Sequence, residues 1–257
     1  MSETHEREER ITVGEGDEAR EIAARITEGD GPTLLWCGGY SSDMTGSKAS
    51  EMVAFARERG LAAVRFDYSG HGASGGRFAD GTISRWLEET VAVANAFTKG
   101  PLVVLGSSMG GWIALRLAQE IERIAGMVLI APAPDFTHLL VEPSLTDEQR
   151  EALTRDGQFT VPSQYGWDPY IYTAKLFEDG RDNLVLDKRL VVGAPVRILQ
   201  GMEDPDVPHT HALRLAEALA EDDVVMTLVR DGDHRLSRDE DLARMRKVLG
   251  EVVDLAA

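Results

Sequence analysis

The clearest chemical signal in this sequence is residues 106–110, which read Gly-Ser-Ser-Met-Gly. They follow an apolar run at residues 102–105 and precede a helical pattern at residues 111–119. A serine between two glycines, at a sharp turn from a strand into a helix, is typical of a nucleophile elbow, G-x-S-x-G. The glycines are needed because so tight a turn leaves no room for side chains beside it. The pattern predicts that Ser108 is a nucleophile, placed where the N–H groups of the helix end favour negative charge.

A serine hydroxyl attacks efficiently only when a base accepts its proton. Of the six histidines, His234 lies in the turn at residues 231–234, directly after the last predicted strand. Where a nucleophile elbow is followed by an acid and then a histidine, the histidine is the base. The order of residues therefore predicts His234 as the base, and a histidine on a surface turn is the alternative.

The third member of such a triad is an acid that holds the imidazole in the right tautomer. Residues 201–208 follow a predicted strand at residues 196–200 and offer three carboxylates. We predict that Asp204 is the acid, because it comes just after the strand end and Pro205 stiffens the turn after it. Asp206 is the alternative, and Glu203 is expected to be solvated.

The negative charge that develops during acyl transfer needs hydrogen-bond donors. One predicted donor is the backbone N–H of Met109, the residue after the nucleophile. The other is expected from the loop after the first buried strand, where Gly38 and Gly39 allow the backbone to approach a substrate. We predict that the backbone N–H of Tyr40 supplies it; a purely structural turn is the alternative.

Two other arrangements of reactive side chains have a weaker basis. Ser107 is adjacent to the predicted nucleophile, but its position in the turn directs it away from the site. His209 and His211 could form a metal site with Asp206, but side chains two residues apart diverge on a helix. We therefore predict no metal and no other cofactor.

The elements that must position these residues alternate between strand and helix. Apolar runs predict strands at residues 11–13 (an edge strand), 33–37, 61–66, 102–105, 127–131, 196–200 and 224–229, and helical spacing predicts helices at residues 48–59, 82–98, 111–121, 209–220 and 239–255. Residues 3–10 are expected to be a frayed, solvated end, and residues 17–28 are ambiguous. Short connections between the elements predict an α/β fold with a doubly wound, mostly parallel sheet. Every motif singled out above lies just after a predicted strand, and in such sheets the chemistry collects at the carboxyl ends of the strands.

Residues 134–190 have a different character from the rest of the chain. They contain prolines, acidic clusters and scattered aromatic residues without a clear strand. We predict that this segment is a small, partly helical cap. Residues 1–133 and 191–257 would then form the core.

Composition limits the possible partners and compartments. The net charge of −17 in 257 residues repels phosphate backbones, so we expect no nucleic-acid partner. No apolar run approaches the roughly 20 residues of a membrane span. A single cysteine, Cys37, excludes an internal disulfide and favours a reducing compartment, which we predict to be the cytoplasm.

Over almost its whole length the sequence resembles the α/β-hydrolase superfamily. The resemblance is carried by Gly-Gly-Tyr-Ser-Ser at residues 38–42, Arg-Phe-Asp-Tyr-Ser-Gly-His-Gly at 65–72, Gly-Ser-Ser-Met-Gly-Gly-Trp at 106–112, and residues 201–208 and 232–234. Residues 39–49, 78–83 and 107–112 resemble more particularly the branch of palmitoyl-protein thioesterases that also cleave acyl glucuronides. In place of that family's frequent His-Gly, the chain has Gly38-Gly39. The branch is mitochondrial, but with no apparent organellar presequence its compartment does not carry over.

The resemblance implies a serine esterase or thioesterase that acts on acyl substrates, with Ser108, Asp204 and His234 as its triad. Two other functions remain open at this stage. One is a hydrolase fold that serves as a binding or scaffold module, because fold does not dictate function. The other keeps the serine chemistry but cleaves a peptide or carbon–carbon bond. The sequence does not indicate an oligomeric state.

Overall fold

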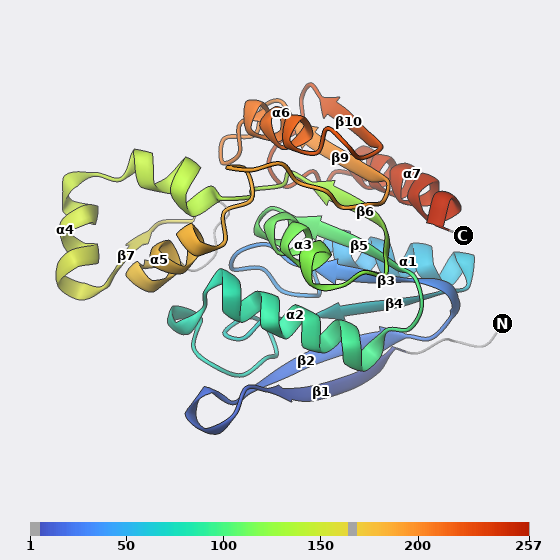
Figure 1. Cartoon of the computed structure of the whole chain (residues 1–257), viewed down its shortest axis with the longest axis horizontal. Helices are drawn as coiled ribbons and strands as arrows, with labels where there is room; N and C mark the ends of the chain where they lie inside the picture. The colour runs from blue at the N-terminus through green and yellow to red at the C-terminus, as the bar shows by residue number, and fades with distance from the viewer. Residues whose placement is uncertain (1–5, 164–168, 257) are drawn as a thin grey trace.

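A computed structural model describes residues 6–163 and 169–256 of the chain. Its centre is an eight-stranded sheet with the strand order β1-β2-β4-β3-β5-β6-β9-β10, running from β1 at the bottom of Figure 1 to β10 at the top. The strands of this sheet are β1 (Arg7–Val13), β2 (Arg20–Thr27), β3 (Asp30–Cys37), β4 (Leu61–Phe66), β5 (Leu102–Ser107), β6 (Ile124–Ile130), β9 (Val196–Gly201) and β10 (Val224–Val229).

The sheet is mostly parallel, as the sequence predicts. Only β2 runs against its neighbours, and every pair from β4 to β10 is parallel. The carboxyl ends of these parallel strands therefore share one edge. The predicted α/β fold with a doubly wound sheet is confirmed.

Helices cover both faces of the sheet because side chains alternate along each strand. On one face, Leu34 and Trp36 of β3 pack with α1 (Ser47–Arg59) and α7 (Asp239–Ala256). On the other, Leu35 and Cys37 pack with α2 (Ile83–Phe97), α3 (Met109–Glu120) and α6 (His209–Ala218). The core is thus two apolar layers, one on each side of the sheet.

Residues 134–190 leave the sheet after β6 and return to it at β9. They contain a short π-helix (Thr137–Val141), a 3-10 turn (Glu142–Ser144), α4 (Asp147–Asp156), β7 (Gln158–Val161), β8 (Tyr170–Thr173) and α5 (Ala174–Asp182). The helices agree with the expected partly helical segment, but the expectation that it has no strand is wrong, because β7 and β8 pair antiparallel. Each of these strands has only four residues, the lower limit for recognising a strand from its pattern, so neither stands out from the irregular sequence around it. In Figure 1, α4 and β7 lie at the left, away from the sheet.

The beginning of the chain also differs from expectation. The charge run at residues 3–10 does not form a frayed end throughout, since β1 begins at Arg7 and Glu6 lies 2.5 Å from the guanidinium of Arg65; residues 3–5 lie outside the described ranges. The ambiguous stretch contains β2. Its charged residue Arg20 is buried because it pairs with Glu89, 2.6 Å away on α2.

The single cysteine, Cys37, ends β3 and is completely buried. Burial raises the pKa of its thiol to about 12. Within the described part of the chain, no helix combines the length and apolar character needed to cross a bilayer.

Candidate active site

The turn between β5 and α3 has the geometry of a nucleophile elbow. Ser108 has φ 54° and ψ −121°, a strained conformation for a residue with a side chain. A Cβ at residue 106 would lie 2.5 Å from the carbonyl oxygen of Gly110, and one at residue 110 would lie 2.0 Å from the carbonyl oxygen of Cys37. Both distances are too short for any side chain, so the two glycines let the helix start directly beside β3.

Replacing Gly110 with alanine is expected to lower the free energy of unfolding by about 3 kcal/mol, since the new methyl group must displace backbone. Gly250→Ala is the matched control, because Gly250 also lies in a helix but its added methyl would be 3.8 Å from the ring of Phe55. This control should be neutral or slightly stabilising. Chemical denaturation of both variants measures the difference, and equal stabilities would contradict the close packing at the elbow.

The structure brings together the three side chains predicted for the triad. Nε2 of His234 lies 3.0 Å from the Oγ of Ser108, and Nδ1 lies 2.8 Å from Oδ2 of Asp204. Because a carboxylate only accepts hydrogen bonds, the Nδ1–H donates to Asp204 and Nε2 is left to accept the serine proton. The side chain of His234 is 14% exposed, so it faces a site that solvent can reach.

The carboxylate of Asp204 is fully buried and accepts from four donors. Oδ1 accepts the backbone N–H groups of Asp206 and Val207 at 2.9 and 2.8 Å. Oδ2 accepts from His234 and, at 3.1 Å, from the amide of Gln200. These bonds fix the carboxylate in one orientation toward the imidazole.

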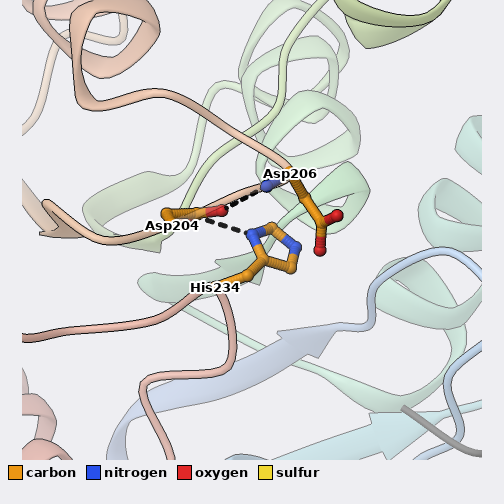
Figure 2. A group of neighbouring side chains, drawn as sticks. All are labelled: Asp204, Asp206 and His234. Carbon is orange, nitrogen blue, oxygen red and sulfur yellow. Dashed lines mark hydrogen bonds and ion pairs between the residues drawn. The ribbon is translucent and has the colours of Figure 1, made fainter. Parts of the chain in front are cut away.

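Asp206, the alternative acid, lies on the other side of the imidazole. Figure 2 shows its carboxylate away from the line that joins Asp204 to His234, and the dashed lines reach only the backbone of Asp206. Glu203 is exposed, as expected. The geometry thus favours Asp204 over both alternatives.

The loop after β3 passes close to Ser108. A Cβ at residue 39 would lie 3.4 Å from the Cβ of Ser108, so Gly39 allows the backbone to come this near. Tyr40 follows, and both it and Met109 line the cavity in front of Ser108. The Tyr40 side chain extends beneath β8, where its hydroxyl donates to the carbonyl of Ile171 and its ring stacks on Tyr172 at 5.5 Å.

The cavity in front of Ser108 has a volume of about 1200 Å³. It lies between the sheet edge and residues 134–190. The outer segment contributes mostly apolar side chains, whereas polar groups line the side near the loop after β3. Residues on the apolar wall are Phe136, Leu140, Val141, Leu145, Phe159, Val161, Ile171 and Tyr172, and those on the polar side include Ser41, Ser42, Asp43, Thr45, Lys48 and Arg235.

The structure also shows supporting residues that the sequence did not reveal. The amide of Gln200 holds Asp204, and the ammonium of Lys48 donates to the carbonyl of Arg235, next to His234. His71 accepts the backbone N–H of Ser41 at 3.2 Å. The available signals were that Gln200 ends a predicted strand and that His71 belongs to the stretch at residues 65–72 that carries the family resemblance.

The candidate metal ligands do not meet as a set. His211 is buried, and its Nε2 lies 2.8 Å from the carbonyl of Pro134, which gives it a structural partner. Among the described residues, the ligand atoms of Asp204, Asp206 and His234 lie within 4.8 Å of one another. Since Asp204 and His234 are hydrogen-bonded to each other, an ion there would have to break that contact.

Known proteins resemble this chain over most of its length. A family model described as "Alpha/beta hydrolase family" matches residues 34–246. The mitochondrial palmitoyl-protein thioesterase ABHD10 of Mus musculus is 30% identical over 235 residues, covering 91% of this chain and 79% of that protein. The Homo sapiens protein of the same name is 28% identical over 235 residues, covering 91% and 76%.

Solved structures show the same similarity in three dimensions. A putative hydrolase from Agrobacterium vitis S4 has a TM-score of 0.95 with 54% identity, covering 96% of this chain and 99% of that one. The mouse alpha/beta hydrolase domain-containing protein 10 has a TM-score of 0.86 with 27% identity, covering 97% and 100%.

Proposed function

The chain belongs to the α/β hydrolase family, and from that premise we propose that it is a serine hydrolase that cleaves carboxylic ester or thioester bonds of acyl substrates. The observation that carries the proposal is the hydrogen-bonded series from Ser108 through His234 to Asp204. The similarity to relatives named palmitoyl-protein thioesterases supports acyl compounds as the substrate class.

In the proposed reaction, Nε2 of His234 takes the hydroxyl proton as the Oγ of Ser108 attacks the substrate carbonyl carbon. Asp204 keeps the imidazole in the required tautomer and stabilises the imidazolium that forms. The tetrahedral intermediate collapses to an acyl-enzyme, and the imidazolium gives its proton to the leaving alcohol or thiol. Water, deprotonated by the same imidazole, then attacks the acyl-enzyme and releases the acid.

The negative charge of each tetrahedral intermediate would be stabilised by the backbone N–H groups of Met109 and Tyr40. Met109 begins α3, where the first N–H groups of a helix have no partner within it. Gly39 brings the other loop to Ser108. Preorganised donors of this kind each contribute about 10²- to 10³-fold to kcat.

The apolar wall of the cavity supports an acyl group as the part of the substrate that binds beneath residues 134–190. These residues act, in this proposal, as a cap on a core formed by residues 1–133 and 191–257. The polar side of the cavity would take the leaving group. The reaction needs no metal or organic cofactor.

We also propose that the protein works in the cytoplasm. Its one cysteine is buried, and the sequence has no second cysteine with which it could form an internal disulfide. Such cysteine usage is typical of a reducing compartment.

Labelling with a fluorophosphonate probe, followed by a panel of esters and thioesters that vary in acyl chain length, tests the proposed function. We expect one covalent label on Ser108 and measurable hydrolysis within the panel, because an activated serine is required for both. A folded protein with an inert Ser108 would instead be a binding module. A labelled protein that hydrolyses only peptides or carbon–carbon bonds would correct the substrate class.

A further inference from the structure

The loop after β3 is held at two points by the glycine-rich loop after β4. Oδ1 of Asp67 accepts the backbone N–H of Met44 at 2.7 Å, and Nε2 of His71 accepts the backbone N–H of Ser41 at 3.2 Å. Ser41 directly follows Tyr40, and its φ of 56° is one that a residue with a side chain adopts only under constraint. The contact with His71 thus lies one residue from the proposed Tyr40 donor.

The hydrogen bonds of His71 define its tautomer. Its Nδ1 lies 3.1 Å from the carbonyl oxygen of Ser69, so Nδ1–H donates there and Nε2 is left as an acceptor. The residue is only 4% exposed. Burial lowers the pKa of the imidazole to about 4, which keeps it neutral and Nε2 unprotonated near neutral pH.

The support behind His71 is rigid and buried. Ser69 donates its backbone N–H to Glu89 at 2.8 Å, and Glu89 is itself paired with Arg20 at 2.6 Å. The imidazole also packs against the rings of Phe78 and Trp86, with centroids 4.9 and 5.3 Å away. An acceptor held this firmly can set the position of the Ser41 peptide.

We propose that His71 is a positioning residue of the oxyanion hole, which fixes the Tyr40 N–H toward the substrate oxygen through its bond to Ser41. The inference rests on the proposed function, because it concerns the reaction at Ser108. His71 never touches the substrate's reacting atoms. Its acceptor nitrogen orders the loop before the transition state forms, so the loss of this acceptor weakens transition-state stabilisation more than substrate binding.

Two variants separate the acceptor from the ring. His71→Phe keeps an aromatic ring among its neighbours but removes the acceptor, and His71→Gln loses the ring but can place an oxygen near the former Nε2. With the best ester of the panel, we expect His71→Phe to lower kcat about 10- to 100-fold and to change KM less than about threefold. His71→Gln should recover most of that loss.

A transition-state analogue provides a second readout. The inhibition constant of a trifluoromethyl ketone, whose adduct with Ser108 carries an oxyanion, should rise in His71→Phe in parallel with the loss of kcat/KM. A role in stability alone would not produce this correlation in a folded variant. Wild-type kcat and inhibition in a folded His71→Phe would overturn the proposal, and so would equal losses in the Phe and Gln variants.

If His71→Phe does not fold, His71→Gln and His71→Asn replace it as the test. Both are amides, but the shorter asparagine cannot reach the Ser41 N–H, so its kcat should be at least about tenfold below that of glutamine. Equal kcat values would overturn the proposal. A wild-type protein without hydrolase activity would instead contradict the proposed function, so the two failures are distinguishable.

Discussion

Replacing Ser108 with alanine is expected to lower kcat for p-nitrophenyl ester hydrolysis by at least about 10⁴-fold. Alanine keeps the shape of the elbow but has no oxygen that can attack a carbonyl or accept an acyl group. It must adopt the same φ of 54° as serine, so the free energy of unfolding should change by less than about 1 kcal/mol. Steady-state kinetics and chemical denaturation of the same preparation measure both quantities.

Ser107→Ala is the control for this prediction, because Ser107 is the neighbouring hydroxyl and ends β5. It should retain activity within about tenfold of wild type, since His234 bonds Ser108. If Ser107→Ala lost activity while Ser108→Ala retained it, Ser107 and not Ser108 would be the nucleophile.

Replacing Asp204 with asparagine should lower kcat by about 10⁴-fold with little change in KM. The amide oxygen can still accept the backbone N–H groups of Asp206 and Val207. Its NH₂ group would then face Nδ1 of His234, a donor opposite a donor. The imidazole must shift its proton to Nε2 to avoid this clash, and that tautomer cannot accept the proton of Ser108.

Asp206→Asn is the matched change on the same loop. Its backbone N–H still bonds Asp204, and its side chain lies off the line between Asp204 and His234 (Figure 2), so we expect kcat to fall less than about tenfold. The comparison is made with one ester under identical conditions. A larger loss in Asp206→Asn than in Asp204→Asn would transfer the role of the acid to Asp206.

The elbow and the alternation of strands and helices could be predicted because their causes are local. Ser108 stands between two glycines, with an apolar run before it and a helical pattern after it. Few structures other than a strand, a sharp turn and a helix are compatible with this pattern at residues 102–120. The helix at residues 82–98 could be predicted for the same reason. Thr82 caps α2 by accepting the backbone N–H of Arg85, and the observed helix differs by one residue at each end.

Other features could not be predicted because they depend on partners distant in the chain. Arg20 is a charged residue in a buried position because Glu88 and Glu89 of α2 both pair with it, and its charge made β2 hard to recognise in the sequence. His71 meets Ser41 because β3 and β4 are parallel neighbours with Trp36 beside Arg65, so their following loops leave the sheet side by side. Neither contact has a signature within a short window of sequence.

The burial of Cys37 also makes the protein convenient for spectroscopy. A thiol that is inaccessible and protonated reacts slowly with maleimides, so the native cysteine need not be removed before labelling. A cysteine introduced at an exposed position of α4 would therefore be the preferred attachment point for a fluorophore or spin label. Such a probe would show whether the outer segment moves relative to the sheet during turnover.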